Sequence, residues 1–285
     1  MDTTHPIGII GAGTMGSGIA HVFARSGFPV LLCDLEQAFL DRALERIRDN
    51  LAREAAKGKL TVAEPDYAVA RIRTTTSRED LAPVSLAIEA ATERFDLKSE
   101  LFRDLDRILA PNVILASNTS SISITKLAAQ TARPHRVIGM HFFNPVPVMA
   151  LVELIRGLQT SQATFDQVRD LALQLGKTPV AVNDAPGFVS NRVLMPLINE
   201  AAFAVMEGVA TPQAVDQVFK LGMAHPMGPL TLADFIGLDV CVDILRVLQE
   251  GFGDPRYRPC PLLVRMVDAG WLGRKSGRGF YTYEK

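Results

Sequence analysis

The segment Gly11-Ala12-Gly13-Thr14-Met15-Gly16 constrains the fold of this chain more than any other feature. It matches the pattern G-x-G-x-x-G, follows an apolar run at residues 6–10 and opens a helical pattern over Met15–Arg25. In such a turn the first glycine permits the bend, the second lets a pyrophosphate approach the backbone, and the third allows close helix–strand packing. Free N–H groups at the helix start favour the anion. The segment therefore predicts a dinucleotide-binding βαβ unit.

Asp34 follows the second apolar run, PVLLC at residues 29–33. A carboxylate at this place can accept hydrogen bonds from a ribose diol, and its charge would repel the additional phosphate of NADP. The glycine pattern alone also fits FAD, and without a ligand the glycines could simply form a turn with Asp34 as a helix cap. Since strand, turn, helix, strand and acid occur in the required order, we predict a dinucleotide site, and Asp34 favours NAD over NADP as the cofactor.

Short apolar runs alternate with helical patterns through the first two thirds of the chain, which predicts an α/β fold with a Rossmann-type, doubly wound and mostly parallel sheet. Further strands are expected at Val84–Ile88, Val113–Ala116, Val137–Met140, 148–155 and 178–182. Helices are expected between them at Glu36–Lys57, Asp96–Leu109, Ile122–Gln130 and Gln162–Leu175.

The later part of the chain reads as a second, all-helical domain, with helices expected at Val189–Glu207, Pro212–Leu221, Pro229–Gln249 and Leu262–Ala269. A chain of 285 residues has room for two cores. The glycine- and proline-containing stretch NDAPG lies between the two patterns and indicates the boundary. We therefore expect an NAD-binding domain at residues 1–184 and a helical domain at residues 185–285.

Composition excludes several classes of partner. Thirty basic residues against 31 acidic ones provide no excess of positive charge for a nucleic-acid backbone. The apolar runs are shorter than the roughly 20 residues that a membrane helix needs, and the first residues carry no basic leader. We therefore expect a cytoplasmic protein with no nucleic-acid or membrane partner. The three cysteines and five histidines lack the spacing of a disulfide framework or a metal site, so no metal is expected.

Several motifs, in order along the chain, resemble those of the 3-hydroxyacyl-CoA dehydrogenase family. They are Ser117–Ser121 (SNTSS), His141–Pro147 (HFFNPVP), Leu151–Glu153 (LVE), Pro186–Arg192 (PGFVSNR), His225–Pro229 (HPMGP) and Gly277–Tyr281 (GRGFY). The resemblance covers almost the whole chain. By length and by the stretch Tyr257–Pro261, the chain is most similar to the single-function bacterial 3-hydroxybutyryl-CoA members.

The resemblance implies a catalytic pair, His141 and Glu153. Imidazole titrates near neutral pH and can take a hydroxyl proton while hydride leaves the same carbon. Glu153 would orient the ring and stabilise its charged form. Without the resemblance, His141 could equally be a surface or packed core histidine. The second histidine motif, at His225, reads as a structural turn because prolines and a glycine surround it.

The resemblance also implies that Ser120 and Asn191 bind the reacting oxygen and act in catalysis as neutral donors. From the sequence alone, Ser120 could be only a helix N-cap, and Asn191 only a packing residue. Further positions match residues that line the cofactor, namely Glu93, Lys98, Asn144 and Lys275, with Ser120 among them. Lys57 matches a lysine directed at the CoA phosphates, although Asn50 replaces the serine often found nearby. Glu93 and Lys98 could instead be an ordinary solvated pair.

Two other functions remain compatible with the residues. A non-catalytic dinucleotide-binding relative would keep the glycine turn but lose the catalytic set. An NAD dehydrogenase of a free hydroxy acid would often carry a lysine where this chain has Asn191 and Arg192. We expect an acyl-CoA substrate and a homodimer formed through amphipathic helices of the helical domain.

Overall fold

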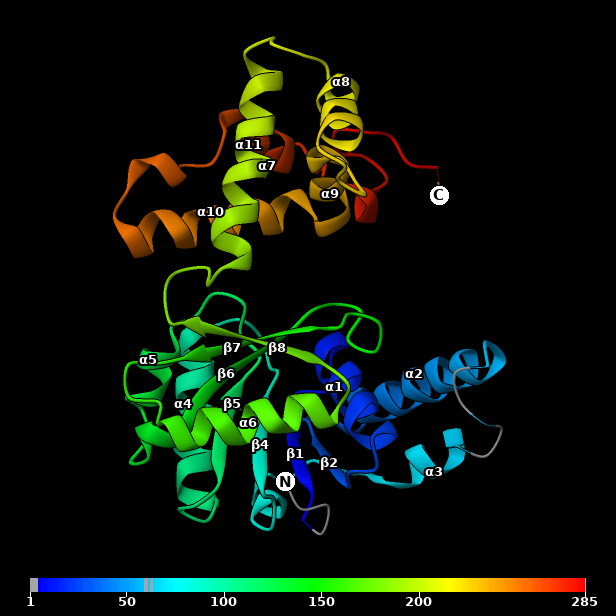
Figure 1. The fold of residues 1–285 in the computed structure, drawn as a ribbon, viewed down its shortest axis with the longest axis vertical. Helices are drawn as coiled ribbons and strands as arrows, with labels where there is room; N and C mark the ends of the chain where they lie inside the picture. Colours follow the sequence, from blue (N-terminus) through cyan, green and yellow to red (C-terminus); the bar gives the residue numbers. More distant parts are fainter. Residues whose placement is uncertain (1–4, 59–60, 62–63, 285) are drawn as a thin grey trace. The chain divides into compact units, whose positions relative to one another are not determined.

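The computed structural model describes residues 5–58, 61 and 64–284, so the outermost residues of the two predicted domains lie outside the described part. The chain forms two compact units, Met1–Ala185 (unit 1) and Pro186–Lys285 (unit 2). Figure 1 shows strands and helices in unit 1 and helices in unit 2.

Unit 1 is built on one eight-stranded sheet in the order β3-β2-β1-β4-β5-β6-β7-β8. The strands are β1 (Ile7–Ile10), β2 (Val30–Cys33), β3 (Ile72–Thr75), β4 (Leu86–Glu89), β5 (Ile114–Ser117), β6 (Val137–Phe142), β7 (Leu151–Arg156) and β8 (Thr178–Asn183). Neighbouring strands are parallel except for the antiparallel pairing of β6 with β7. The predicted doubly wound, mostly parallel sheet is therefore confirmed.

The helices of unit 1 are α1 (Thr14–Arg25), α2 (Gln37–Ala56), α3 (Glu64–Ala70), α4 (Phe95–Ile108), α5 (Ile124–Ala128) and α6 (Gln162–Gln174), with short 3₁₀ turns at Arg78–Leu81 and Pro134–Arg136. Helix α6 crosses in front of the strands in Figure 1. A single core cluster joins helix and sheet side chains such as Ile9, Phe23 and Leu171. Burial on both faces explains why β1, β2, β4 and β5 read as continuous apolar runs.

The sequence patterns predicted neither α3 nor β3. Strand β3 has the sequence IRTT, and Ile72 is the only buried residue in it. It is one of the two edge strands of the sheet and pairs with β2 alone. Because its side chains are mostly polar and partly exposed, the strand carries no apolar run from which it could have been recognised.

Unit 2 is helical, with α7 (Ser190–Met206), α8 (Pro212–Gln217), α9 (Pro229–Ile236), α10 (Leu238–Phe252) and α11 (Pro261–Asp268), and with short turns at Val218–Gly222, Pro255–Tyr257 and Arg274–Ser276. The expected single helix Pro229–Gln249 is wrong. Gly237, at φ +107°, separates α9 from α10 because this backbone conformation cannot continue a right-handed helix.

Two buried aspartates hold the carboxyl-terminal part of unit 2 in place. Asp216 accepts hydrogen bonds from the backbone N–H groups of Leu230 and Thr231 at the start of α9. Asp234 accepts from the N–H groups of Phe280 and Tyr281, at 2.9 and 3.0 Å. The GRGFY motif thus has a structural role in unit 2, and Gly228 of the HPMGP motif packs so closely on Asp216 that a Cβ there would lie 2.3 Å from the Asp216 Cγ atom.

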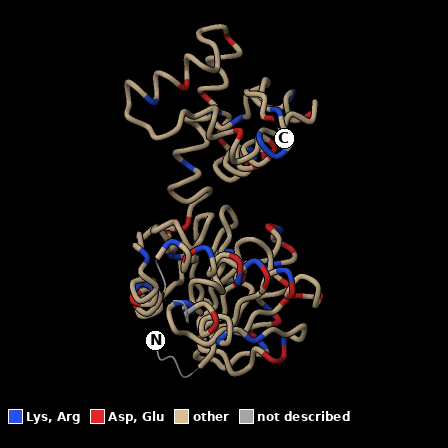
Figure 2. Tube along the Cα trace, turned by 90° about the vertical axis from the view of Figure 1, so that its right-hand side faces the viewer, with Lys and Arg blue, Asp and Glu red and all other residues tan. Residues whose placement is uncertain are grey.

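Charged residues are distributed over the whole chain. Figure 2 shows basic and acidic residues interspersed in both units rather than gathered in one segment. In the part of the chain that the structure describes, no helix combines the length and apolar character needed to cross a membrane.

Candidate active site

The glycine turn between β1 and α1 has the backbone geometry of a phosphate-binding loop. Gly11 has φ +104°, and a Cβ there would lie 2.6 Å from the Ala90 carbonyl oxygen. A Cβ at Gly16 would lie 1.7 Å from the Gly11 oxygen. At Gly13, by contrast, nothing lies within 4 Å of the Cβ position, so the backbone there is open to a ligand. Each glycine therefore meets the steric demand expected of its position.

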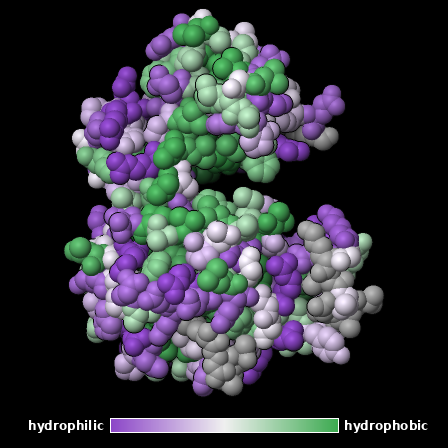
Figure 3. Space-filling model, in the orientation of Figure 1, coloured by the Kyte–Doolittle hydropathy of each residue, from purple (hydrophilic) through white to green (hydrophobic). Residues whose placement is uncertain are grey.

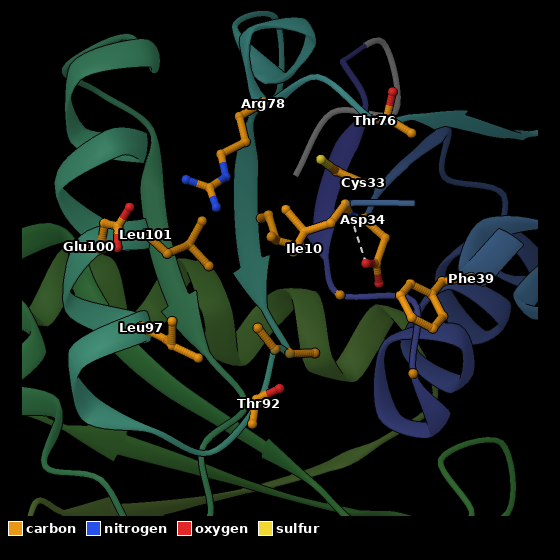
Figure 4. A pocket seen from close by; sticks show the side chains of 15 residues that line it. Ile10, Cys33, Asp34, Phe39, Thr76, Arg78, Thr92, Leu97, Glu100 and Leu101 are labelled. Atoms are coloured by element: carbon orange, nitrogen blue, oxygen red, sulfur yellow. Dashed lines mark hydrogen bonds between the residues drawn. The ribbon is translucent and has the colours of Figure 1, made fainter. Parts of the chain in front are cut away.

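A pocket of about 370 Å³ in unit 1 extends from this turn to Asp34 (Figure 4). Asp34 accepts hydrogen bonds from the backbone N–H groups of Ala12, at 2.5 Å, and Leu35, at 2.7 Å. Apolar side chains, including Phe39 and Leu97, form much of the remaining wall. An apolar slot with one fixed carboxylate and an exposed glycine backbone fits the adenosine end of a dinucleotide.

A buried ion pair lies beside this pocket, at the carboxyl end of β4. Lys98 Nζ lies 2.5 Å from Glu89 Oε1, and the two side chains are 1% and 0% exposed. Glu89 also accepts hydrogen bonds from the Ser117 hydroxyl and the Ala91 N–H, both at 2.6 Å. The interpretation of Lys98 as an ordinary solvated residue is therefore wrong.

Glu89 was not among the site residues predicted from the sequence. The expected strand Val84–Ile88 ended one residue before it, whereas β4 extends to Glu89. A usable signal was present, because a carboxylate that ends an otherwise apolar, buried strand needs a specific partner. The partner, Lys98, is nine residues away on α4 and could not be identified from a spacing rule.

Glu93 holds the SNTSS segment after β5. Its Oε1 atom accepts hydrogen bonds from the Thr119 hydroxyl at 2.5 Å, the Ser120 N–H at 3.0 Å and the Ser121 N–H at 3.2 Å. Burial alone would raise the pKa of Glu93, but nearby Lys98 and these hydrogen bonds hold the pKa below its usual value. Glu93, Lys98 and Ser120 thus form one connected group.

Ser120 is not the N-cap of α5. Ser123 occupies the N-cap position, and its side chain accepts a hydrogen bond from the Lys126 N–H. Ser120 instead lies in the preceding loop, with its hydroxyl 3.4 Å from Glu93 Oε1. The helix-capping interpretation of Ser120 is therefore wrong.

His141 and Glu153 lie opposite each other on β6 and β7. His141 Nδ1 is 2.8 Å from Glu153 Oε2, and the residues are 8% and 3% exposed. In the neutral tautomer that donates from Nδ1 to the carboxylate, Nε2 carries the lone pair that can take a proton. The geometry is that of an oriented general base.

The carboxyl ends of β4, β5 and β6 meet at one edge of the sheet. Ser117 of β5 pairs with Gly139 of β6, and the Phe142 N–H donates to Asn118 Oδ1 at 2.9 Å. Asn144 lies just beyond β6 in the connection to β7. In open α/β sheets this edge is where ligands bind.

Three further predicted residues lie on other elements of the two units. Lys57 is exposed at the carboxyl end of α2 in unit 1. In unit 2, Asn191 lies in the first turn of α7, largely buried, and Lys275 Nζ is 2.6 Å from Asp239 Oδ1. Among the described residues, no group of three or more His, Cys, Asp or Glu side chains could hold a metal ion.

Comparison with known proteins identifies relatives over the whole chain. The NAD binding domain of 3-hydroxyacyl-CoA dehydrogenase matches residues 6–185, and the C-terminal domain of the same family matches residues 187–283. The chain is 57% identical to a probable 3-hydroxybutyryl-CoA dehydrogenase of Bacillus subtilis, over 97% of this chain and 96% of that protein. It is 41% identical to a 3-hydroxyadipyl-CoA dehydrogenase of Escherichia coli, over 99% of this chain and 60% of that protein.

One solved structure is similar to this chain over nearly its whole length. The crystal structure of an (S)-3-hydroxybutyryl-CoA dehydrogenase from Ralstonia eutropha superposes with a TM-score of 0.96 at 53% identity and covers 99% of both chains. This chain therefore matches the protein from Ralstonia eutropha in fold, in length and in sequence.

Proposed function

Because this chain belongs to the 3-hydroxyacyl-CoA dehydrogenase family, we propose that it oxidises L-3-hydroxybutyryl-CoA, or a similarly short 3-hydroxyacyl-CoA, to the 3-oxoacyl-CoA. It is an NAD-dependent oxidoreductase. The observation that carries the proposal is the buried His141–Glu153 pair at the ligand-binding edge of a dinucleotide-binding sheet. The reaction is reversible, since the same pair can return the proton.

In the oxidation, the hydrogen on C3 leaves as hydride and the hydroxyl group loses its proton, so that a C3 carbonyl forms. The dinucleotide supplies the hydride acceptor. His141 takes the hydroxyl proton at Nε2, and Glu153, bonded to Nδ1, orients the ring and stabilises the imidazolium. In the reverse direction His141 donates this proton to the carbonyl oxygen.

Neutral donors stabilise charge on the reacting oxygen. We assign this role to Ser120 and Asn191, which can donate hydrogen bonds without competing for the proton. The Ser120 backbone N–H is held by a hydrogen bond to Glu93, and this supports the role. A donor that is already held in place needs little reorganisation when charge develops on the substrate oxygen. Lys57 is assigned to the CoA phosphates.

The dinucleotide is held by residues from several loops. The backbone from Gly11 to Gly16, including Ala12, Thr14 and Met15, would bind the pyrophosphate, and Asp34 would accept from the adenosine ribose. Glu93, Lys98, Ser120, Asn144 and Lys275 are assigned to the rest of the cofactor. Glu89 would act through Lys98, which it fixes at 2.5 Å.

In the same proposal, the two domains have different roles. Residues 1–184 form the NAD-binding domain, and residues 185–285 contribute to substrate binding and to a homodimer. Unit 2 exposes large apolar side chains, among them Val193, Leu221 and Phe235, and Figure 3 shows hydrophobic area on its surface. Such area on a small helical domain favours self-association. We place the protein in the cytoplasm, with acyl-CoA as its partner and no nucleic acid or membrane.

The alternatives predict different substrates. The relative from Escherichia coli is named for 3-hydroxyadipyl-CoA, whose acyl chain ends in a free carboxylate. A dehydrogenase of free hydroxy acids would not need the CoA moiety. The intact His141–Glu153 pair disfavours a non-catalytic relative.

The test is NADH formation, followed by absorbance, from NAD+ and L-3-hydroxyacyl-CoA esters of increasing chain length. The proposal expects the highest kcat/KM with 3-hydroxybutyryl-CoA, little activity with NADP+ and none with free 3-hydroxybutyrate. A preference for 3-hydroxyadipyl-CoA or for the free acid would replace the proposed substrate. Sedimentation as a monomer at micromolar concentration would contradict the homodimer.

A further inference from the structure

Lys177 is a buried cation with no part in the mechanism above. It lies between α6 and β8 and is 6% exposed. Its Nζ atom donates hydrogen bonds to the carbonyl oxygens of Val146, at 2.5 Å, and Met149, at 2.7 Å. Both carbonyls belong to residues 143–150, the connecting loop between β6 and β7.

The surroundings of Lys177 are unusual for a buried ammonium group. Among the described residues, no carboxylate forms an ion pair with it within 4.0 Å. Burial lowers the pKa of Lys177, the charge of Arg25 lowers the pKa further, and the charge of Glu54 acts in the opposite direction. Burying a charge in this way is costly unless strong hydrogen bonds compensate. Here the compensation comes from the two loop carbonyls.

The connecting loop also has contacts that do not involve Lys177. Its own turn is local, since the N–H groups of Val148 and Met149 both donate to the Pro145 oxygen. The Val146 side chain packs against α1, where a Cβ at Gly18 would lie 2.9 Å from it. The Thr178 N–H donates to the Ala150 oxygen at 2.8 Å, directly beside Lys177. Lys177 therefore supplies the charge-assisted bonds that fix this loop.

Fixing the loop matters because it joins the two strands that carry the proton-transfer pair. His141 lies two residues before the loop, and Glu153 lies three residues after it. Their 2.8 Å contact requires β6 and β7 to keep both register and spacing. The loop also carries Asn144, which we assign to the cofactor.

We propose that Lys177 is a positioning residue that holds the connecting loop, and through it the His141–Glu153 pair and Asn144, in the reactive arrangement. This inference rests on the proposed function for its kinetic part. Its structural part, the fixation of the loop, stands independently of the substrate.

The experiment compares the full-length wild type with Lys177→Met, which keeps the aliphatic stem, and with Lys177→Arg, which keeps charge and donors. Lys126→Met is the matched control, because Lys126 is an exposed lysine on α5. Hydrogen exchange of the Val148 and Met149 amides reports on the loop. Steady-state kinetics with NAD+ and L-3-hydroxybutyryl-CoA report on positioning.

In Lys177→Met we expect loop exchange to accelerate on the order of tenfold, as for loss of a hydrogen bond to a charged group, while the remaining core amides stay protected. We expect kcat to fall about 10- to 100-fold with KM for the acyl-CoA changed much less, as for misplaced reacting groups. Lys177→Arg should recover part of both effects, and Lys126→Met should show neither.

Unchanged loop exchange in Lys177→Met overturns the inference even if the wild type oxidises no 3-hydroxyacyl-CoA at all. Faster exchange with wild-type kcat overturns the positioning role. If Lys177→Met does not fold, Lys177→Gln is measured in the same way. Loss of the fold in every Lys177 variant shows a role in stability of the whole unit, and this also overturns the inference.

Discussion

His141 Nδ1 lies 2.8 Å from Glu153 Oε2 because β6 and β7 run antiparallel, which places the two residues directly opposite each other. Twelve residues separate them in the chain. With β7 reversed against β6, a short connecting loop is sufficient to return a carboxylate to the edge where β6 ends. The antiparallel pairing in this Rossmann-type sheet thus has a chemical consequence.

Asp34 should determine the choice of cofactor. Asn at this position keeps the shape but loses the charge and one of the acceptor oxygens bonded by Ala12 and Leu35. In Asp34→Asn we expect KM for NAD+ to rise by about 10-fold or more, from the loss of a charged hydrogen bond, and discrimination against NADP+ to shrink. Steady-state kinetics with both dinucleotides measure this. The control is Asp49→Asn, which changes an exposed residue on α2. If the ratio of kcat/KM with NAD+ to kcat/KM with NADP+ is the same in Asp34→Asn as in the wild type, Asp34 does not select the cofactor.

The buried pair Glu89–Lys98 should show strong coupling in a double-mutant cycle. Removing one member of a buried ion pair leaves an uncompensated charge, at a cost of about 3 kcal/mol or more. Glu89→Gln and Lys98→Met should each destabilise the protein, whereas the double variant should be clearly less destabilised than the sum of both. Urea unfolding of the four proteins provides the free energies. If the destabilisation of the double variant equals the sum of those of the two single variants, the 2.5 Å contact is not an effective ion pair.

His21 should make stability depend on pH. It is fully buried in α1, and burial lowers its pKa from the ordinary 6.5, although Glu54 partly opposes the effect. The unfolded chain then binds a proton near pH 6.5 before the folded protein does. The free energy of unfolding must therefore fall as pH is lowered below this value, by at most about 1.4 kcal/mol per pH unit.

His21→Met removes the titrating group and should flatten this dependence between pH 7.5 and 5.5. The exposed His135→Met should keep the wild-type dependence. Urea unfolding at a series of pH values gives the slopes. Equal slopes in the wild type and in His21→Met would show that His21 does not cause the loss of stability.

Most of the correct predictions came from residues that lie close together in the sequence. The glycine turn, its helix and Asp34 are close in the chain, and their roles follow from steric rules that act within one βαβ unit. The sheet was predictable because buried parallel strands are apolar throughout. The edge strand β3 was missed because one buried residue, Ile72, makes no pattern.

Non-local pairings were not predictable in this way. Neither the burial of Lys98 against Glu89 nor the bonds from Lys177 to the connecting loop follow from any spacing, because each depends on how separate elements pack. The break between α9 and α10 depends on one glycine, Gly237, inside an apolar periodicity that continues on both sides. The resemblance to a family indicated His141 and Glu153, and the structure adds the register that brings them together.

The most direct test of the account is the rate of NADH formation from NAD+ and L-3-hydroxybutyryl-CoA in the wild type, His141→Ala, Glu153→Gln and the control His135→Ala. Loss of a general base should reduce kcat about 100- to 10,000-fold in His141→Ala, with a smaller loss in Glu153→Gln, and NAD+ binding and His135→Ala should remain as in the wild type. A His141→Ala protein that is folded, binds NAD+ and retains kcat close to the wild type would contradict the assignment of proton transfer to this pair.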